Sequence, residues 1–243
     1  MVGALVVYFM GGDPVAYLAQ NAGNVQNSGA PDARDADKKS FAGVVLAETE
    51  DAWKEEFSKV SKTYVPPKLV LFRNRVESAC GRASSASGPF YCPPDSQVYL
   101  DLSFLDELSR NLGAKGDFAG AYVIAHEIGH HVQNLLGIEG EFRAKMRRMG
   151  EGERNRASVA IELQADCLAG IWAKHAENKN ILETGDIAEA LNAASAVGDD
   201  RLQKRSQGYV VPDSFTHGSS AQRQEAFQRG YQGGNLNACL ANG

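Results

Sequence analysis

The chain has 243 residues, a hydrophobic fraction of 43% and a formal net charge of -5. This length fits one domain, or one domain plus an anchor, and the apolar content is sufficient for a proper core. The acidic balance leaves no basic footprint, which argues against a nucleic-acid partner.

The first forty residues differ in character from the rest. Val2–Met10 is apolar but too short to cross a bilayer, which needs about 20 residues. No Lys or Arg precedes Arg34, so the charged start of a signal peptide is missing. Residues 1–20 are therefore either the remnant of a membrane anchor or an apolar segment that packs on the domain. Residues 21–40 are polar and read as a linker, and 41–243 are predicted to form the domain.

Hydrophobic periodicity and turn signals predict a helical chain with two strands. A helix is expected over 41–60, followed by strands at 68–72 and 97–102. Ser103 is expected to cap a helix to Leu112. The charged stretch Glu139–Gly152 is expected to be exposed. Further helices are expected at 117–136, at 156–176, from Thr184 or Asp186 to Val197, and from a capping box of Ser219 and Gln222 to about Gly230.

The four cysteines are Cys80, Cys92, Cys167 and Cys239, and none forms a C-x-x-C pair, which disfavours a cysteine zinc site. Cys80 and Cys92 bracket a loop of small residues that suits a disulfide, and Cys167 could pair with Cys239. An even count without metal spacing favours an oxidising compartment. The alternative is four free thiols, two of them buried.

The helix predicted over 117–136 contains H-E-x-x-H, with His126 and His130 four residues apart. Side chains at this spacing share one face of a helix, so the two imidazoles suit a tetrahedral zinc ion. Glu127 lies one step round the helix, where it can act as general base on a metal-bound water. Gly129 costs about 1 kcal/mol relative to alanine in a helix, which suggests that it leaves room beside the metal. The alternative is a helix with solvated His and Glu.

A second helix carries Glu162 and Asp166, also four residues apart and among apolar neighbours. Like charges at this spacing repel, and buried carboxylates need a partner or a metal. Glu162 is the candidate third zinc ligand, and Asp166 is expected to accept the free ring N–H of His126 or His130. The alternative is an exposed acidic edge.

HEIGHHVQNLLG followed by ASVAIELQADCLAGIWA resembles the bacterial neutral zinc metallopeptidases, a branch of the gluzincin-like enzymes. The similarity extends to LVLFRNRVESACGRASSASGPFYCPPDSQVYLDLSF and FTHGSSAQRQEAFQRGYQGG, and so covers roughly Phe41 to Cys239. The resemblance implies a zincin-like α+β fold, mainly helical, with a small β-sheet beside the active-site helix. It also implies one zinc ion on His126, His130 and Glu162, with Glu127 catalytic. An anchored, extracytoplasmic enzyme is implied as well, although a full anchor and its basic flank are not present here.

The expected function is that of a zinc metalloendopeptidase acting on a peptide or protein. The strand Gln97–Asp101 is a candidate edge to which an extended substrate could add. His217 is the candidate donor to a developing oxyanion, with Arg223 and Tyr231 as further candidates, and the alternative is that His217 is an ordinary loop residue.

Two other histidines are expected to lie outside the chemistry. His131 is interpreted as a packing residue or one that supports a ligand, and His175 as solvent-exposed. Three rival functions remain open. One is a deformylase-like amidohydrolase with Cys92 as ligand, another is a non-catalytic zinc-stabilised interaction or chaperone domain, and the last is an anchored scaffold without metal. The sequence identifies neither the substrate nor the oligomeric state.

Overall fold

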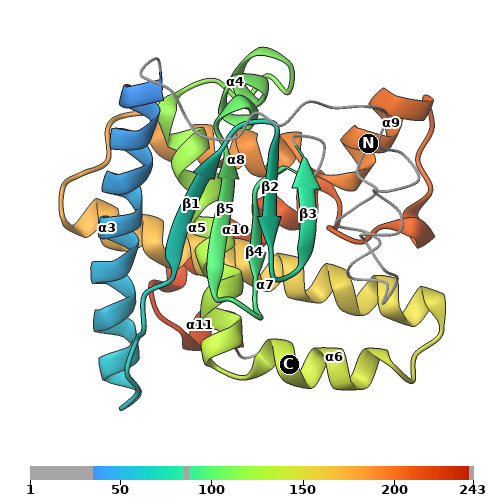
Figure 1. The fold of residues 1–243 in the computed structure, drawn as a ribbon, viewed down its shortest axis with the longest axis horizontal. Coiled ribbons are helices and arrows are strands. Elements are labelled where there is room, and N and C mark those ends of the chain that lie inside the picture. The colour runs from blue at the N-terminus through green and yellow to red at the C-terminus, as the bar shows by residue number, and fades with distance from the viewer. Residues whose placement is uncertain (1–34, 85–87, 241–243) are drawn as a thin grey trace.

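Helices form most of the fold, together with a three-stranded sheet and a separate two-stranded hairpin (Figure 1). The computed structural model describes residues 35–84 and 88–240. The longer helices are α3 (Ala36–Lys59), α5 (Asp117–Leu135), α7 (Glu151–Asn178), α8 (Asp186–Ala196) and α10 (Ser220–Gly233). The shorter ones are α4 (Leu102–Arg110), α6 (Ile138–Met146), α9 (Asp199–Gln207), η3 (Pro212–Ser214) and α11 (Asn237–Leu240). The predicted class, mainly helical α+β, is confirmed.

Helix α5 forms the centre of the molecule. Every residue from Phe118 to Gln133 is buried, because α3, α7, α8 and the sheet surround the helix. A helix that is apolar on nearly all sides is stable only inside a core. The polar side chains of this helix that do become buried, among them His126 and His130, must therefore find partners within the protein.

Three glycines allow the helices to approach closely. A Cβ on Gly129 would lie 2.8 Å from the carbonyl oxygen of Ala165 in α7. A Cβ on Gly170 would lie 2.1 Å from the Phe227 carbonyl oxygen in α10, and one on Gly230 would lie 1.8 Å from that of Cys167. The space that Gly129 leaves is thus taken by the backbone of α7, and not by the metal site as the sequence suggested.

The sheet has the strand order β1-β5-β4. Strand β5 (Gln97–Asp101) pairs in parallel with β1 (Lys68–Phe72) and antiparallel with β4 (Phe90–Cys92). The prediction that β5 offers an open edge is therefore wrong: four of its five residues are buried, as expected for a central strand. The edge strand next to it in the chain is β4.

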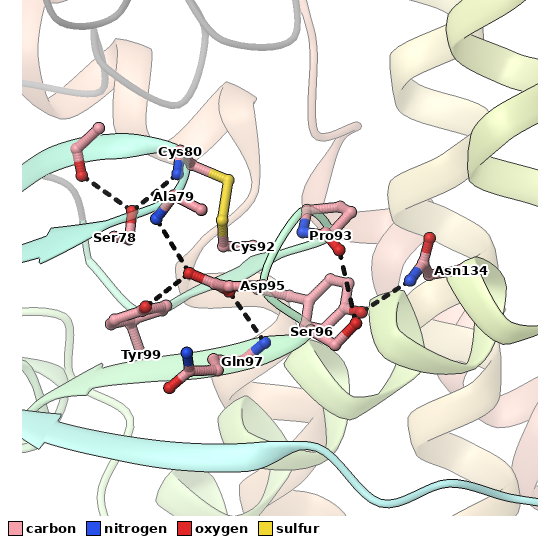
Figure 2. The surroundings of a disulfide bond; sticks show 12 residues. Ser78, Ala79, Cys80, Cys92, Pro93, Asp95, Ser96, Gln97, Tyr99 and Asn134 are labelled. Carbon is pink, nitrogen blue, oxygen red and sulfur yellow. Dashed lines mark hydrogen bonds between the residues drawn. A yellow bond between two sulfur atoms is a disulfide. The ribbon is translucent and has the colours of Figure 1, made fainter.

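A separate hairpin, β2 (Arg75–Ser78) with β3 (Gly81–Ser84), is tied to this sheet. The disulfide Cys80–Cys92 joins the hairpin turn to β4, and Asp95 accepts hydrogen bonds from the Ala79 amide and the Tyr99 hydroxyl (Figure 2). A second disulfide joins Cys167 in α7 to Cys239 in α11. Both predicted pairings are present.

Several boundaries differ from the sequence-based expectation. Asp101, and not Ser103, caps α4, because its carboxylate accepts the Ser103 amide at 2.8 Å. The stretch 139–152 is not simply exposed. It contains most of α6, where Phe142 and Met146 pack with Ile161 of α7. Spacing of four residues along α6 places these apolar side chains on one face despite the many charges around them.

The predictions for residues 1–20 and for most of 21–40 concern segments outside the described residues. Helix α3 begins at Ala36, five residues before the predicted start and inside the stretch interpreted as a linker. Among the helices of the described ranges, none combines the length and apolarity that a bilayer crossing requires.

Candidate metal centre

Three candidate ligands converge from two helices. Nε2 of His126 lies 3.2 Å from one oxygen of Glu162, and Nε2 of His130 lies 3.5 Å from the other. One ligand atom from each residue falls within 4.8 Å of the others, and all three side chains are buried. Two imidazole nitrogens and one carboxylate are the donor set of a catalytic zinc site with an open position. The residues present therefore fit the ion that the sequence predicts.

The opposite ring nitrogen of each histidine is held by another side chain. Nδ1 of His126 donates to Asp166 at 2.8 Å, as predicted for one of the two histidines. Nδ1 of His130 donates to the amide oxygen of Gln133 at 2.9 Å. The Gln133 amide nitrogen is itself bonded to the Ile161 carbonyl, which fixes the orientation of the amide. Nε2 is therefore the ring atom of each histidine that faces the centre.

A buried arginine balances the charge of Asp166. The guanidinium of Arg223 in α10 donates to both carboxylate oxygens, at 2.7 and 3.0 Å, and the Tyr122 hydroxyl donates to the same group. Sequence reasoning found no cation for Asp166 within a turn of α7 because this one lies 57 residues away. Arg223 is thus a partner of Asp166, not the oxyanion donor considered from the sequence.

These contacts shift the pKa values of the site. Burial disfavours a charge on His126, but the carboxylates of Asp166 and Glu162 outweigh it and raise its pKa to about 10. Burial would raise the pKa of Asp166, yet Arg223 and His126 lower it to about 2. Burial opposes the charge of Glu162 as well, but the His130 and His126 imidazoles hold its pKa well below the usual value. Asp166 and Glu162 are therefore both ionised, and their negative charge favours a cation in the centre.

Glu127 lies beside the centre without sharing its ligand positions. Burial raises the pKa of its carboxyl group, while the His126 and His130 imidazoles oppose that rise. The backbone of Tyr91 in β4 lies close enough to oppose this rise as well. A carboxyl group with a raised pKa, next to a metal centre, suits proton transfer near neutral pH.

His217 is held by a buried carboxylate at the start of α9. The amides of Thr216, His217 and Gly218 all donate to one oxygen of Asp199, at 2.7 to 3.0 Å. The other oxygen lies 3.2 Å from Nδ1 of His217. Burial lowers the pKa of this imidazole, but Asp199 and the nearby Glu162 more than compensate, and the pKa is raised. The sequence did not identify Asp199 as the partner of His217. The one local feature that marks Asp199 is its position at the start of a helix.

The third oxyanion candidate, Tyr231, lies elsewhere. Its hydroxyl donates to Glu177 at 2.6 Å. Glu177 is fifteen residues beyond Glu162 on the same helix, which corresponds to roughly 22 Å at the rise of an α-helix. Of the three candidates, Arg223 and His217 interact electrostatically with Glu162, and Arg223 is already the partner of Asp166. His217 is therefore the candidate that remains.

Comparison with known proteins agrees with this centre. Residues 1–241 match the model of the family described as "Putative neutral zinc metallopeptidase". The chain belongs to this family. The family resemblance inferred from the paired motifs is thereby confirmed, and the family description supports zinc and a hydrolase.

Relatives of this metallopeptidase occur in Escherichia coli and Mycobacterium tuberculosis. Protein YpfJ of Escherichia coli (strain K12) is 56% identical over 199 residues, which are 82% of this chain and 69% of the relative. Protein Rv2575 of Mycobacterium tuberculosis (strain ATCC 25618 / H37Rv) is 46% identical over 187 residues, 72% of this chain and 62% of that protein. Both are described as uncharacterized, so neither supplies a substrate. No solved structure matches the chain.

The two remaining histidines of the metallopeptidase domain bind other parts of the fold. His131 bonds the Tyr91 hydroxyl at 3.0 Å and the Val65 carbonyl at 2.7 Å, which fits the packing role expected of it. His175 is 9% exposed and bonds Glu56 of α3 at 3.1 Å, so the prediction that it faces solvent is wrong. Its charged neighbours in sequence misled that prediction, because α3 covers this turn of α7.

Proposed function

We propose that the protein is a zinc-dependent endopeptidase in which Glu127 is the general base. The observation that carries the proposal is the convergence of His126, His130 and Glu162 in a buried centre with Glu127 directly beside it. These three residues would hold one zinc ion. When bound, zinc would act as a Lewis acid that polarises the substrate carbonyl and lowers the pKa of the attacking water.

The protein's own groups account for the proton transfers. Glu127 takes a proton from the attacking water and delivers one to the leaving amine, for which its raised pKa is suited. His217 donates from Nε2 to the carbonyl oxygen as negative charge develops there, because its Nδ1 is engaged with Asp199. Its raised pKa favours the protonated form that this role needs.

The position of β4 supports a polypeptide substrate. Tyr91 of β4 pairs with Val98 of β5, and its backbone is near enough to Glu127 to lower the pKa of that carboxyl group. Among the strands that the structure describes, β4 pairs with β5 alone, so its other edge is available beside the general base. An extended peptide added along this edge would bring a backbone carbonyl next to Glu127.

Glu127→Gln tests the function. The variant should keep its zinc and its melting temperature but lose about two to four orders of magnitude in cleavage of casein or a quenched peptide. Glu141→Gln, at an exposed acid of α6, is the matched control and should cleave normally. Full activity in Glu127→Gln would contradict the proposal.

The rival functions predict other outcomes. A non-catalytic zinc domain would contain one zinc per chain and leave casein intact in the wild type too, and a metal-free scaffold would contain no zinc by elemental analysis. A deformylase-like centre would need the Cys92 thiolate as ligand, but Cys92 is bonded to Cys80. The disulfide therefore argues against the deformylase-like centre.

An extracytoplasmic location belongs to the same proposal. Disulfides persist in oxidising compartments, and this chain has two with no free cysteine. Membrane attachment through residues 1–20 is the further expectation. Fractionation of cells that produce the chain with and without these residues tests both points, and recovery of reduced protein from the cytosol would count against the location.

A further inference from the structure

The turn after α9 displays apolar side chains on the surface. Tyr209, Val210 and Val211 follow one another between α9 and η3 and are 62%, 37% and 38% exposed. Figure 1 shows α9 at the side of the molecule opposite α3, away from the central helices. We call residues Lys204–Val211 the α9 tip. Its apolar side chains contribute nothing to the core.

The backbone of the α9 tip is held in place by specific hydrogen bonds. Gln203 accepts the Val211 amide at 2.7 Å and donates to the Ser214 hydroxyl at 2.9 Å. That hydroxyl donates in turn to the Val211 carbonyl at 2.8 Å. Gly208 ends α9 in a left-handed conformation, with φ of 84°. The backbone thus holds these apolar side chains in a fixed arrangement although they remain exposed to solvent.

The α9 tip is also locally basic on an acidic protein. The chain carries a net charge of -5, yet residues 201–211 contain Arg201, Lys204 and Arg205 and no acidic residue. The two acids that open α9 are turned inward. Asp199 binds the amides of 216–218, and Asp200 accepts the Ser220 hydroxyl at 2.7 Å. Their charge is therefore engaged with the fold. The outer end of α9 presents two cations, Lys204 and Arg205, and Arg201 lies in the first turn of the same helix.

We propose that the α9 tip docks on an anionic phospholipid surface. Tyrosine partitions to the interface of a bilayer, and each nearby Lys or Arg adds attraction to acidic headgroups. A protein partner fits less well. The three apolar side chains expose roughly 250 Å² in all, judged from the area of an aromatic side chain, against about 800 Å² per partner in a stable complex. Interface cores are also depleted of lysine.

Docking in this way would place a particular part of the molecule at the membrane. The α9 tip ends six residues before His217, and α9 begins at Asp199, which holds His217. Contact at the tip would therefore set the orientation of the metal centre relative to the bilayer. The inference depends on the α9 tip alone and stands or falls separately from peptidase activity.

A tryptophan reporter tests the contact directly in the full chain. The sequence has two tryptophans, Trp53 and Trp172, which are 1% and 3% exposed. In a Tyr209→Trp variant the new indole is the one in water, so its emission should shift to the blue when phosphatidylglycerol-containing vesicles are added. Brominated acyl chains should quench it, and pure phosphatidylcholine vesicles should have little effect. An unshifted emission at saturating vesicle concentration would overturn the proposal.

Vesicle co-sedimentation of matched variants gives the second measurement. Lys204→Gln/Arg205→Gln should weaken partitioning at least tenfold, because each cation is worth about fivefold at an anionic surface. Tyr209→Ser/Val210→Ser/Val211→Ser should weaken it similarly without changing the melting temperature. The controls are Arg147→Gln/Arg148→Gln, an exposed pair after α6, and Val44→Ser, 59% exposed on α3, and both should bind like wild type.

Two results would refute the assignment. Equal binding by wild type and by the α9-tip variants would show that attachment uses another segment, such as the N-terminal residues. A blue shift of Tyr209→Trp with casein but not with anionic vesicles would identify the tip as a protein-binding surface instead.

Discussion

Asp166 links the candidate ligand His126 to the buried guanidinium of Arg223. It accepts hydrogen bonds from His126, Tyr122 and Arg223 while fully buried. Its negative charge therefore serves two purposes: it orients the ring of a candidate ligand, and it neutralises a guanidinium that is almost fully buried. A single substitution affects both, and a second can separate them.

Asp166→Asn should weaken zinc binding by about 10- to 100-fold, as loss of a carboxylate behind a metal-bound histidine does. It should also cost about 3–5 kcal/mol of unfolding free energy, because Arg223 keeps a buried and unpaired charge. Adding Arg223→Met should recover much of the stability but not the zinc affinity. Chelator competition and urea unfolding measure the two effects. Zinc affinity equal to wild type in Asp166→Asn would contradict the role of the carboxylate.

From the sequence, only those parts of this centre that lie within a single helix could be predicted. His126 with His130, and Glu162 with Asp166, are paired at a spacing of four residues, so helical geometry alone places each pair on one face. Arg223 and Asp199 contribute through tertiary contacts between distant segments, and no local pattern marks them. Gln133 lies three residues after His130 and was within reach of the same helical argument.

Helix α5 packs on α7, and α7 packs on α10, through close contacts at glycines. Gly129 meets the backbone of α7, and Gly170 meets that of α10. Because the obstructing atoms are backbone and not flexible side-chain ends, an added methyl group can be accommodated only by moving a helix. This packing also sets the distance between His126 on one helix and Glu162 on the other.

Gly129→Ala should therefore destabilise the protein by about 1–3 kcal/mol, despite the better helix propensity of alanine. Gly170→Ala, with a closer contact, should cost more. Gly43→Ala in α3 is the control, because nothing lies within 4 Å of its Cβ, and it should stabilise by about 0.5–1 kcal/mol. Urea unfolding of the three variants gives the comparison. Stabilisation by Gly129→Ala would show that α5 and α7 can move apart without loss of stability.

Elements with strong apolar periodicity were predictable, and those without it were not. Helices α5, α7 and α8 and strands β1 and β5 agree with the expected ranges within a few residues. Helix α9 has the sequence DDRLQKRSQ, in which Leu202 is the one apolar residue, so periodicity gave no signal. Its start is stabilised by bonds to residues 216–220, which are tertiary. The position of β5 within the sheet depends on pairing, which strand patterns do not specify.

The two disulfides constrain the chain on different scales. Cys80–Cys92 spans 12 residues within the sheet, whereas Cys167–Cys239 spans 72 and holds the C-terminal helix α11 on α7. The loop-entropy model predicts that the longer loop contributes more to stability.

Cys167→Ala/Cys239→Ala should lower the unfolding free energy by about 4 kcal/mol, and Cys80→Ala/Cys92→Ala by about 3 kcal/mol, in the loop-entropy model. Urea unfolding of each double variant against the oxidised wild type measures both values. Thiol titration of the denatured, unreduced wild type should find no free cysteine. A larger loss from the shorter loop would mean that strain or contacts around Cys92 outweigh chain entropy.

Glu56 connects three parts of the chain that are far apart in sequence. It lies in α3, bonds His175 of α7 at 3.1 Å, and accepts the Leu236 amide at 3.1 Å just before α11. Lys59 adds a contact at 2.7 Å. Burial opposes the charge of this carboxylate, but the hydrogen bonds from His175 and Lys59 prevail and lower its pKa from 4.5 to about 2.

Glu56→Gln should therefore lower the unfolding free energy at neutral pH by roughly 1–3 kcal/mol, the range for hydrogen bonds to a charged group. Because the native pKa lies below the unfolded value, this contribution is complete above pH 4.5 and disappears as the pH falls toward 2. The difference in unfolding free energy between wild type and variant, measured by urea unfolding, should decrease as the pH falls from 4.5 toward 2. Glu55→Gln, whose side chain is 57% exposed, should show a much smaller gap. A gap for Glu56→Gln that stays constant down to the lowest pH would mean that the carboxylate acts through its shape and not through its charge.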